Sequence, residues 1–172
     1  MDGGDGEATW TPIEIADGEW AGWRVWSNDP FEILSGPFYC RRDEAGKMIC
    51  AFRAEKKHMN NSGAVHGGCL LTFADYALFC IGAEAIEGSG SVTASLNADF
   101  IDAARLGEVI EASGEVVRAG RSLVFMRGLI STAGRPLMTF SAIVKKVRRG
   151  SAVQVPADAD GVARMAASQR VT

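Results

Sequence analysis

The sequence predicts an α+β fold in which a curled antiparallel β-sheet wraps around one long central α-helix. The segment from Cys69 to Glu87 carries apolar residues at helical spacing and also on its other faces, which indicates a helix enclosed by protein. Four strand-length runs rich in β-branched and aromatic residues follow it, separated by short turn segments. A sheet curled around the helix would bury both the helix and the inner face of the sheet.

A hairpin precedes this helix. From Phe38 to Glu55 an apolar-rich run is interrupted by the turn residues Asp43 to Gly46, which predicts two paired strands. A polar connection leads into the helix, and Gly88, Ser89 and Gly90 end it. Because short connections join the four later strands, we expect these strands to be antiparallel neighbours. Their predicted ranges are Val92–Ile101, Val109–Arg118, Leu123–Ser131 and Leu137–Val147.

The chain divides into one domain with irregular ends. Residues 1–9 are rich in glycine and acids, so we expect them to be disordered. Residues 10–37 hold all four tryptophans, and this lead-in has enough apolar area to pack on the domain. The domain itself covers residues 38–149, and the alanine-rich tail at 150–172 receives no function.

Composition excludes several classes of protein. With 172 residues and 47% hydrophobic content, the chain can bury one core. A net charge of -3 provides no basic field that would attract nucleic acid. The sequence contains no apolar stretch of membrane-spanning length and no secretory signal. We therefore expect a cytoplasmic protein without a nucleic-acid or membrane partner.

The four cysteines point to buried thiols. Cys40, Cys50, Cys69 and Cys80 form no C-x-x-C pair, and only two histidines accompany them, which argues against a metal site. We expect reduced and mostly buried side chains, with a disulfide as the competing interpretation.

Asp75 is the candidate centre of the chemistry. It is the only ionisable carboxylate or base between Gly67 and Ala83, in the middle of an otherwise apolar helix. A buried carboxylate is costly unless it is paired, hydrogen-bonded or used in a reaction. A contact with an internal water or a helix cap is the structural alternative.

The helix start supplies a second candidate. His66, Gly67 and Gly68 lie where unpaired backbone N–H groups and the positive end of the helix dipole would face outward. A carbonyl oxygen bound there would be stabilised as it becomes an oxyanion. The alternative is that the glycines only permit a tight turn.

The two candidates cannot meet within one chain. His66 and Asp75 are nine residues apart, so on one helix they would lie roughly 13 Å from each other. If both act on one substrate, the acid must come from a neighbouring subunit. This predicts a homodimer with two shared sites.

The run from Asn60 to Asp75, N-x(5)-H-G-G-x(6)-D, resembles the signature of the PaaI-like hotdog-fold thioesterases. It is also similar to their mammalian relatives of the acyl-CoA thioesterase 13 type. The likeness continues through the later strands and covers roughly residues 60–147. It implies a hotdog fold over the domain and thioester hydrolysis as the activity.

The resemblance also implies roles for individual residues. Asp75 matches the family's general base or nucleophile, and Gly67 matches the glycine whose N–H polarises the thioester carbonyl. His66 and Asn60 match the groups that orient the thioester, and Thr93 matches a residue that helps to position the attacking water. In the family the acid and the Ser or Thr come from the partner subunit.

Coenzyme A would be bound as part of the substrate, and no separate cofactor is implied. Gly68 and the turn Gly120, Arg121 and Ser122 match positions near coenzyme A, where Arg121 could pair with a phosphate. Positive charge beside that turn could come from Lys145, Lys146, Arg148 and Arg149.

The sequence therefore favours an acyl-CoA thioesterase that forms a homodimer or a tetramer built as a dimer of dimers. The main alternative is a hotdog protein that binds acyl-CoA without turnover. Nucleophilic catalysis by Cys69 and a dehydratase or isomerase on the same scaffold are further alternatives. The acyl group is not specified, although an acyl pocket could be shaped by Trp20, Trp23, Trp26, Phe31 and Phe38.

Overall fold

The computed structural model describes residues 12–26 and 29–148. Residues 1–9, which we expected to be disordered, and the tail at 150–172 therefore lie outside the described residues, as does Trp10. The domain limits expected from the sequence stay predictions.

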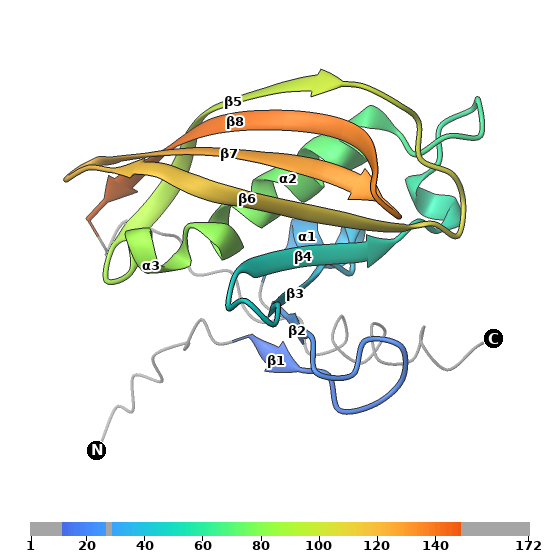
Figure 1. Cartoon of the computed structure of the whole chain (residues 1–172), viewed down its shortest axis with the longest axis horizontal. Helices are drawn as coiled ribbons and strands as arrows, with labels where there is room; N and C mark the ends of the chain where they lie inside the picture. Colours follow the sequence, from blue (N-terminus) through green and yellow to red (C-terminus); the bar gives the residue numbers. More distant parts are fainter. Residues whose placement is uncertain (1–11, 27–28, 149–172) are drawn as a thin grey trace, which may run out of the picture.

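Eight antiparallel strands form one curled sheet that arches over a central helix, which confirms the predicted fold (Figure 1). The strands follow the order β1-β2-β3-β4-β6-β7-β8-β5 across the sheet. Their bounds are β1 Ile13–Glu14, β2 Arg24–Val25, β3 Tyr39–Arg42, β4 Met48–Arg53, β5 Gly90–Phe100, β6 Val109–Ala119, β7 Leu123–Thr132 and β8 Arg135–Val147.

The strand order corrects one prediction. β5 pairs with β8, and β6 pairs with β4, so the first two of the four later strands are not neighbours. The reason lies in the connection between β5 and β6, which is tied to other parts of the chain. The Ile101 N–H donates to the Leu137 carbonyl at 2.8 Å, and the carbonyl of the buried Ala104 accepts from the Val65 N–H at 2.8 Å. The hairpins β3–β4, β6–β7 and β7–β8 are as predicted.

The central helix is shorter than predicted. It begins at Gly67 but ends at Ile81, so the expectation of one helix reaching Glu87 was wrong. The Met126 side chain packs at Gly82, where an added Cβ would lie 3.0 Å from its sulfur, and the chain turns there. No helix in the described ranges is long and apolar enough to cross a bilayer. The helices are α1 Pro30–Ser35, the 3₁₀ turn η1 Lys56–His58, α2 Gly67–Ile81 and α3 Ala83–Ile86.

Aromatic side chains join α2 to the sheet. The rings of Phe52 and Phe73 lie 4.8 Å apart between centroids, and the Phe38 ring lies 5.3 Å from each of them. All three side chains are buried. Since large aromatic side chains contribute the most apolar area to a core, this contact fixes α2 against β4.

The lead-in forms a second, smaller core. Successive residues of a strand face opposite sides, so Cys40 packs with the main core while Tyr39 packs with the second one. Trp20 stacks on Tyr39 with 4.4 Å between ring centroids, and Trp23 meets Trp20 edge to face at 5.3 Å. These tryptophans therefore cover the outer side of the β3–β4 hairpin rather than the helix.

A pair of glycines lets the sheet close over the end of α2. Gly114 and Gly128 are cross-strand partners on β6 and β7. A Cβ added to Gly128 would lie within 2.7 Å of two atoms of the Phe140 ring, and one added to Gly114 would lie 3.2 Å from Ile81. The missing side chains leave the room that these two apolar groups occupy.

We predict that Gly128→Ala lowers the free energy of unfolding by about 2 kcal/mol or more, because the methyl group overlaps the Phe140 ring. Urea unfolding measures the change. Ser141→Ala, on the exposed face of β8, is the control and should stay within about 0.5 kcal/mol of wild type. Equal midpoints for Gly128→Ala and wild type would contradict this role of the glycine.

Candidate active site

Asp75 is held by a hydrogen bond from β5. The Thr93 hydroxyl donates to the Asp75 carboxylate at 2.6 Å, in a part-buried setting. A bulge in β5 between Thr93 and Ser95 makes this contact possible. Because the bulge shifts the alternation of side chains, Thr93 faces the helix together with Leu96 and Ala98 further along the strand.

His66 forms the cap of α2. Its Nδ1 accepts from the Gly68 N–H at 2.9 Å, and its carbonyl accepts from the Cys69 N–H at 2.9 Å. Among the described residues, the N–H of Gly67 has no hydrogen-bond acceptor. The helix start therefore keeps one backbone donor for another molecule, with the positive end of the helix dipole behind it.

Asn60 shapes the loop before α2. Its side-chain oxygen accepts from the N–H groups of Ser62 at 2.9 Å and Ala64 at 3.1 Å. Its own N–H donates to the Ala64 carbonyl at 2.8 Å. The amide NH₂ is the part of this side chain that could orient a substrate, since the oxygen is used within the loop.

The chain brings these residues together in two groups and keeps the groups apart. Thr93 contacts Asp75, while the Phe100 ring lies 3.2 Å from the position of a Cβ on Gly67. β5 therefore runs antiparallel to α2. Thr93, near the start of β5, contacts Asp75, and Phe100, at the end of β5, lies beside Gly67. Gly67 and Asp75 are eight residues apart on α2, which corresponds to about 12 Å along the helix axis. One chain cannot place both at a single carbonyl group.

The turn of the β6–β7 hairpin lies at the Thr93 end of the sheet. The Gly120 N–H donates to the Leu123 carbonyl at 2.8 Å, and the Ser122 carbonyl accepts from the Lys146 N–H at 2.9 Å. β8 lies between β7 and β5, so this turn is level with the start of β5. Arg121 is exposed at the tip. Of the basic residues proposed beside it, Lys145, Lys146 and Arg148 are described, and Arg149 lies outside the described residues.

A cavity of about 330 Å³ lies directly beside Asp75. Leu71, Thr72 and Tyr76 of α2 line one side. The other side is formed by Asp29, Phe31 and Glu32 of the α1 segment. This cavity adjoins the predicted catalytic acid, so it is the candidate site for the part of a substrate that leads away from the reacting carbonyl.

Glu32 is the residue that sequence reasoning missed. Burial, and after it the negative charges of Asp29 and Asp75, raise the pKa of the Glu32 carboxyl to about 8. Helix α1 could have been recognised, because Asp29 caps the N–H groups of Phe31 and Glu32 and Pro30 follows it at the first helical position. No local signal, however, places this helix against Asp75.

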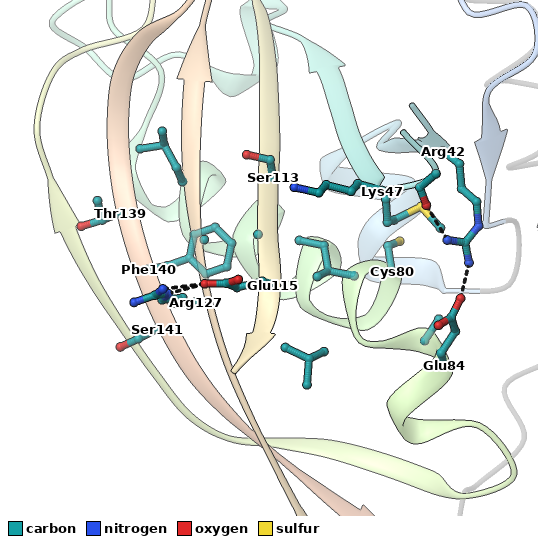
Figure 2. Close-up of a pocket in the computed structure, with 18 of the residues that line it drawn as sticks. Arg42, Lys47, Cys80, Glu84, Ser113, Glu115, Arg127, Thr139, Phe140 and Ser141 are labelled. Atoms are coloured by element: carbon teal, nitrogen blue, oxygen red, sulfur yellow. Dashed lines mark hydrogen bonds and ion pairs between the residues drawn. The ribbon is translucent and has the colours of Figure 1, made fainter. Parts of the chain in front are cut away.

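A larger cavity of about 910 Å³ lies near the other end of α2 (Figure 2). None of the predicted site residues lines it. Two ion pairs lie in its lining, as Figure 2 shows for Arg42 with Glu84 and for Arg127 with Glu115. The groups proposed for the chemistry are therefore elsewhere.

Cys69 is unsuited to nucleophilic attack. Burial raises the pKa of its thiol to about 11, so the thiol stays protonated at neutral pH. The Nδ1 atom of the nearby His66 is already occupied by the Gly68 N–H. Cys40, Cys50 and Cys80 are buried, and all four cysteines are free thiols.

Comparison with known proteins identifies the family. The profile of the thioesterase superfamily matches residues 62–139. A predicted esterase of Pseudomonas aeruginosa is 30% identical over 120 residues, which covers 69% of this chain and 90% of the relative. Human acyl-coenzyme A thioesterase 13 is 31% identical over 99 residues, covering 55% of this chain and 68% of the relative.

Solved structures share the fold. A hypothetical thioesterase of Streptococcus pneumoniae, determined with coenzyme A, has a TM-score of 0.61 at 22% identity and covers 70% of this chain and 95% of its own. The PaaI protein of E. coli has a TM-score of 0.62 at 16% identity, covering 70% and 86%. The chain thus belongs to the thioesterase superfamily, as a thioester hydrolase with a PaaI-like hotdog fold.

Proposed function

We propose that this protein hydrolyses an acyl-CoA thioester to a free acid and coenzyme A, at sites shared between two copies of the chain. The observation that carries the proposal is the hydrogen bond from Thr93 to Asp75 on the buried helix of a thioesterase-superfamily fold. The relative named acyl-coenzyme A thioesterase 13 and the Streptococcus structure with coenzyme A support this substrate class. Coenzyme A is part of the substrate, and the proposed reaction uses no separate cofactor.

Asp75 activates water or attacks directly. The Thr93 hydroxyl donates to one carboxylate oxygen, which leaves the other oxygen for the reaction. As a general base, Asp75 takes a proton from water while the water oxygen bonds to the thioester carbon. The tetrahedral intermediate expels coenzyme A, whose sulfur receives the proton. As a nucleophile, Asp75 would attack the thioester carbon and expel coenzyme A as a thiolate, which leaves a mixed anhydride. Water then cleaves the anhydride to the free acid and the Asp75 carboxylate, and its proton goes to the thiolate.

Gly67 stabilises the oxyanion. Its N–H has no acceptor among the described residues and stands at the positive end of the α2 dipole. The His66 cap holds the helix start in place, and the Asn60 amide borders the same loop. The Asp75 that serves this carbonyl comes from a second copy, since the acid of the same helix is too distant.

The open edge of β5 is the proposed contact between copies. β5 stands last in the sheet order, so one of its edges has no partner strand within the described residues. Phe100 and Ile101 are more than half exposed beside it. Antiparallel pairing of two β5 strands about a twofold axis between Leu96 and Asn97 would bring Thr93 level with the partner subunit's Phe100. Asp75 would then approach the partner subunit's Gly67.

Coenzyme A would reach the turn at the end of the β6–β7 hairpin. Arg121 is exposed there and can pair with a phosphate, while the backbone of Gly120 and Ser122 shapes the turn. Gly68 contributes less directly to coenzyme A binding, because its N–H donates to Nδ1 of His66. A tetramer would repeat the same dimer twice.

We predict that Asp75→Asn lowers kcat at least about 10²-fold with folding intact, because the amide cannot accept the proton. The measurement is release of free thiol from a panel of acyl-CoA substrates. Asp17→Asn, an exposed acid between β1 and β2 at the other edge of the sheet, is the control and should keep the wild-type rate. Saturable binding of every acyl-CoA without thiol release by the wild type would instead favour a binding protein.

Gly67→Pro tests the backbone donor. Proline removes the N–H but suits the first position of a helix, and His66 before it already has the extended backbone that proline requires, at φ -63° and ψ 133°. We expect kcat to fall about 10²- to 10³-fold. Gly67→Ala keeps the N–H and adds the same Cβ beside Phe100, so it should retain most of the rate. Equal losses in both variants would argue for a steric effect only.

Mixing two inactive variants tests the shared site. Unfolded Asp75→Asn and Gly67→Pro chains are mixed in equal amounts and refolded together. If the acid and the N–H come from different chains, each mixed dimer has one intact site, and about a quarter of the wild-type rate returns. If one chain supplied both groups, no activity would return.

A further inference from the structure

The cavity beside Asp75 has a wall that the proposed reaction does not use. Helix α1 contributes Glu32 and Phe31 to this wall, facing Leu71 and Tyr76 across the cavity. Its volume of about 330 Å³ is at the small end of the range for ligand sites, which suits a compact group. If the proposed function is correct, the acyl group lies here.

Helix α1 is fixed at both ends although none of its residues is fully buried. At its start, the Asp29 carboxylate accepts from the N–H groups of Phe31 and Glu32, at 2.9 Å each. At its end, the Ser35 carbonyl is 2.9 Å from Nε2 of the buried His58. Phe31 is 61% exposed, so this large apolar side chain of the helix does not pack in the core. These anchors hold Glu32 at one position beside the cavity.

The cavity is rich in carboxyl groups, and no basic side chain of the described residues lines it. Asp29, Glu32 and Asp75 line it, and none of them forms an ion pair with a described residue. An acyl chain that ends in a carboxylate would lose water there and meet like charge. An uncharged acyl group would instead contact the apolar side chains of Leu71 and Phe31.

We infer that Glu32 is a specificity-determining residue of this site. In the neutral form, its carboxyl presents an uncharged wall to the acyl group beside Asp75, so that an apolar acyl chain is accepted. The carboxylates of Asp29 and Asp75 disfavour acyl groups that carry a negative charge at their far end. The neutral acid can donate a hydrogen bond into the cavity, which the ionised form cannot do.

The surroundings of Glu32 determine when it is neutral. Burial is the first cause that raises the pKa of Glu32 to about 8, followed by the charges of Asp29 and Asp75 and by Cys40 of β3. The pKa of Tyr76 and that of Cys40 are both raised, so these groups stay neutral, and burial lowers the pKa of His58. Glu32 is therefore mainly protonated at pH 7 and ionises as the pH rises through 8.

The test compares hexanoyl-CoA with adipyl-CoA, which have the same carbon chain and differ in a terminal carboxylate. We expect the wild type to prefer hexanoyl-CoA in kcat/KM by at least about tenfold. Glu32→Gln, a neutral isostere, should keep this preference, and Glu32→Lys should reduce it at least about tenfold. Glu44→Lys makes the same charge change in the exposed β3–β4 turn and should leave the preference unchanged.

The pH profile separates this role from a structural one. Between pH 7 and pH 9 the wild type should lose kcat/KM for hexanoyl-CoA as Glu32 ionises, because the carboxylate must lose water against the apolar acyl chain, whereas Glu32→Gln should not. Matching profiles for the two proteins, or equal use of both substrates by the wild type, would overturn the inference. If no substrate releases thiol, only the proposed function fails, because the same preference is then measured from the dissociation constants of the two ligands.

Discussion

The arrangement of the site depends on how a carboxylate is accommodated in a helix that the sheet encloses. Asp75 follows two fully buried residues and precedes another, so its oxygen atoms have few partners apart from those that the sheet supplies. The Thr93 hydroxyl supplies one, and it reaches the helix only because β5 contains a bulge at that point. The one-residue bulge thus allows the Asp75 carboxylate to be hydrogen-bonded. Without that bond its burial would lower the free energy of unfolding.

The antiparallel run of β5 along α2 has a second effect. It keeps the acid at one end of the contact and the free backbone donor at the other, so a single chain holds two incomplete halves. In the proposed dimer each half is completed by the opposite half of the second copy. Activity would then depend on assembly, because a separated chain would retain its fold but lose the geometry of the reaction.

Much of the fold follows from local patterns. The β3–β4 hairpin, the four later strands and the position of the helix start are set by turn residues and side-chain periodicity, and all were predicted to within a few residues. What local patterns could not give depends on contacts between distant segments. The break at Gly82 lies where Met126 of β7 packs against the helix end, and β5 lies beside β8 while the β5–β6 connection is hydrogen-bonded to distant segments.

In the site, too, some residues could be predicted from local sequence patterns and others depend on contacts between distant segments. The spacing from Asn60 to Asp75 indicated both candidate groups, and the helix rise alone required them to be separate. Glu32 could not be found in this way, because it approaches Asp75 through the docking of α1 and carries no motif of its own. Likewise, the use of the Asn60 oxygen within its own loop is visible only in the folded chain.

The cap at the start of α2 also determines which tautomer His66 adopts. Since Nδ1 accepts from the Gly68 N–H, the neutral imidazole must carry its hydrogen on Nε2. The ring that ends the loop therefore offers its Nε2–H as a side-chain donor beside the start of the helix that carries the Gly67 amide.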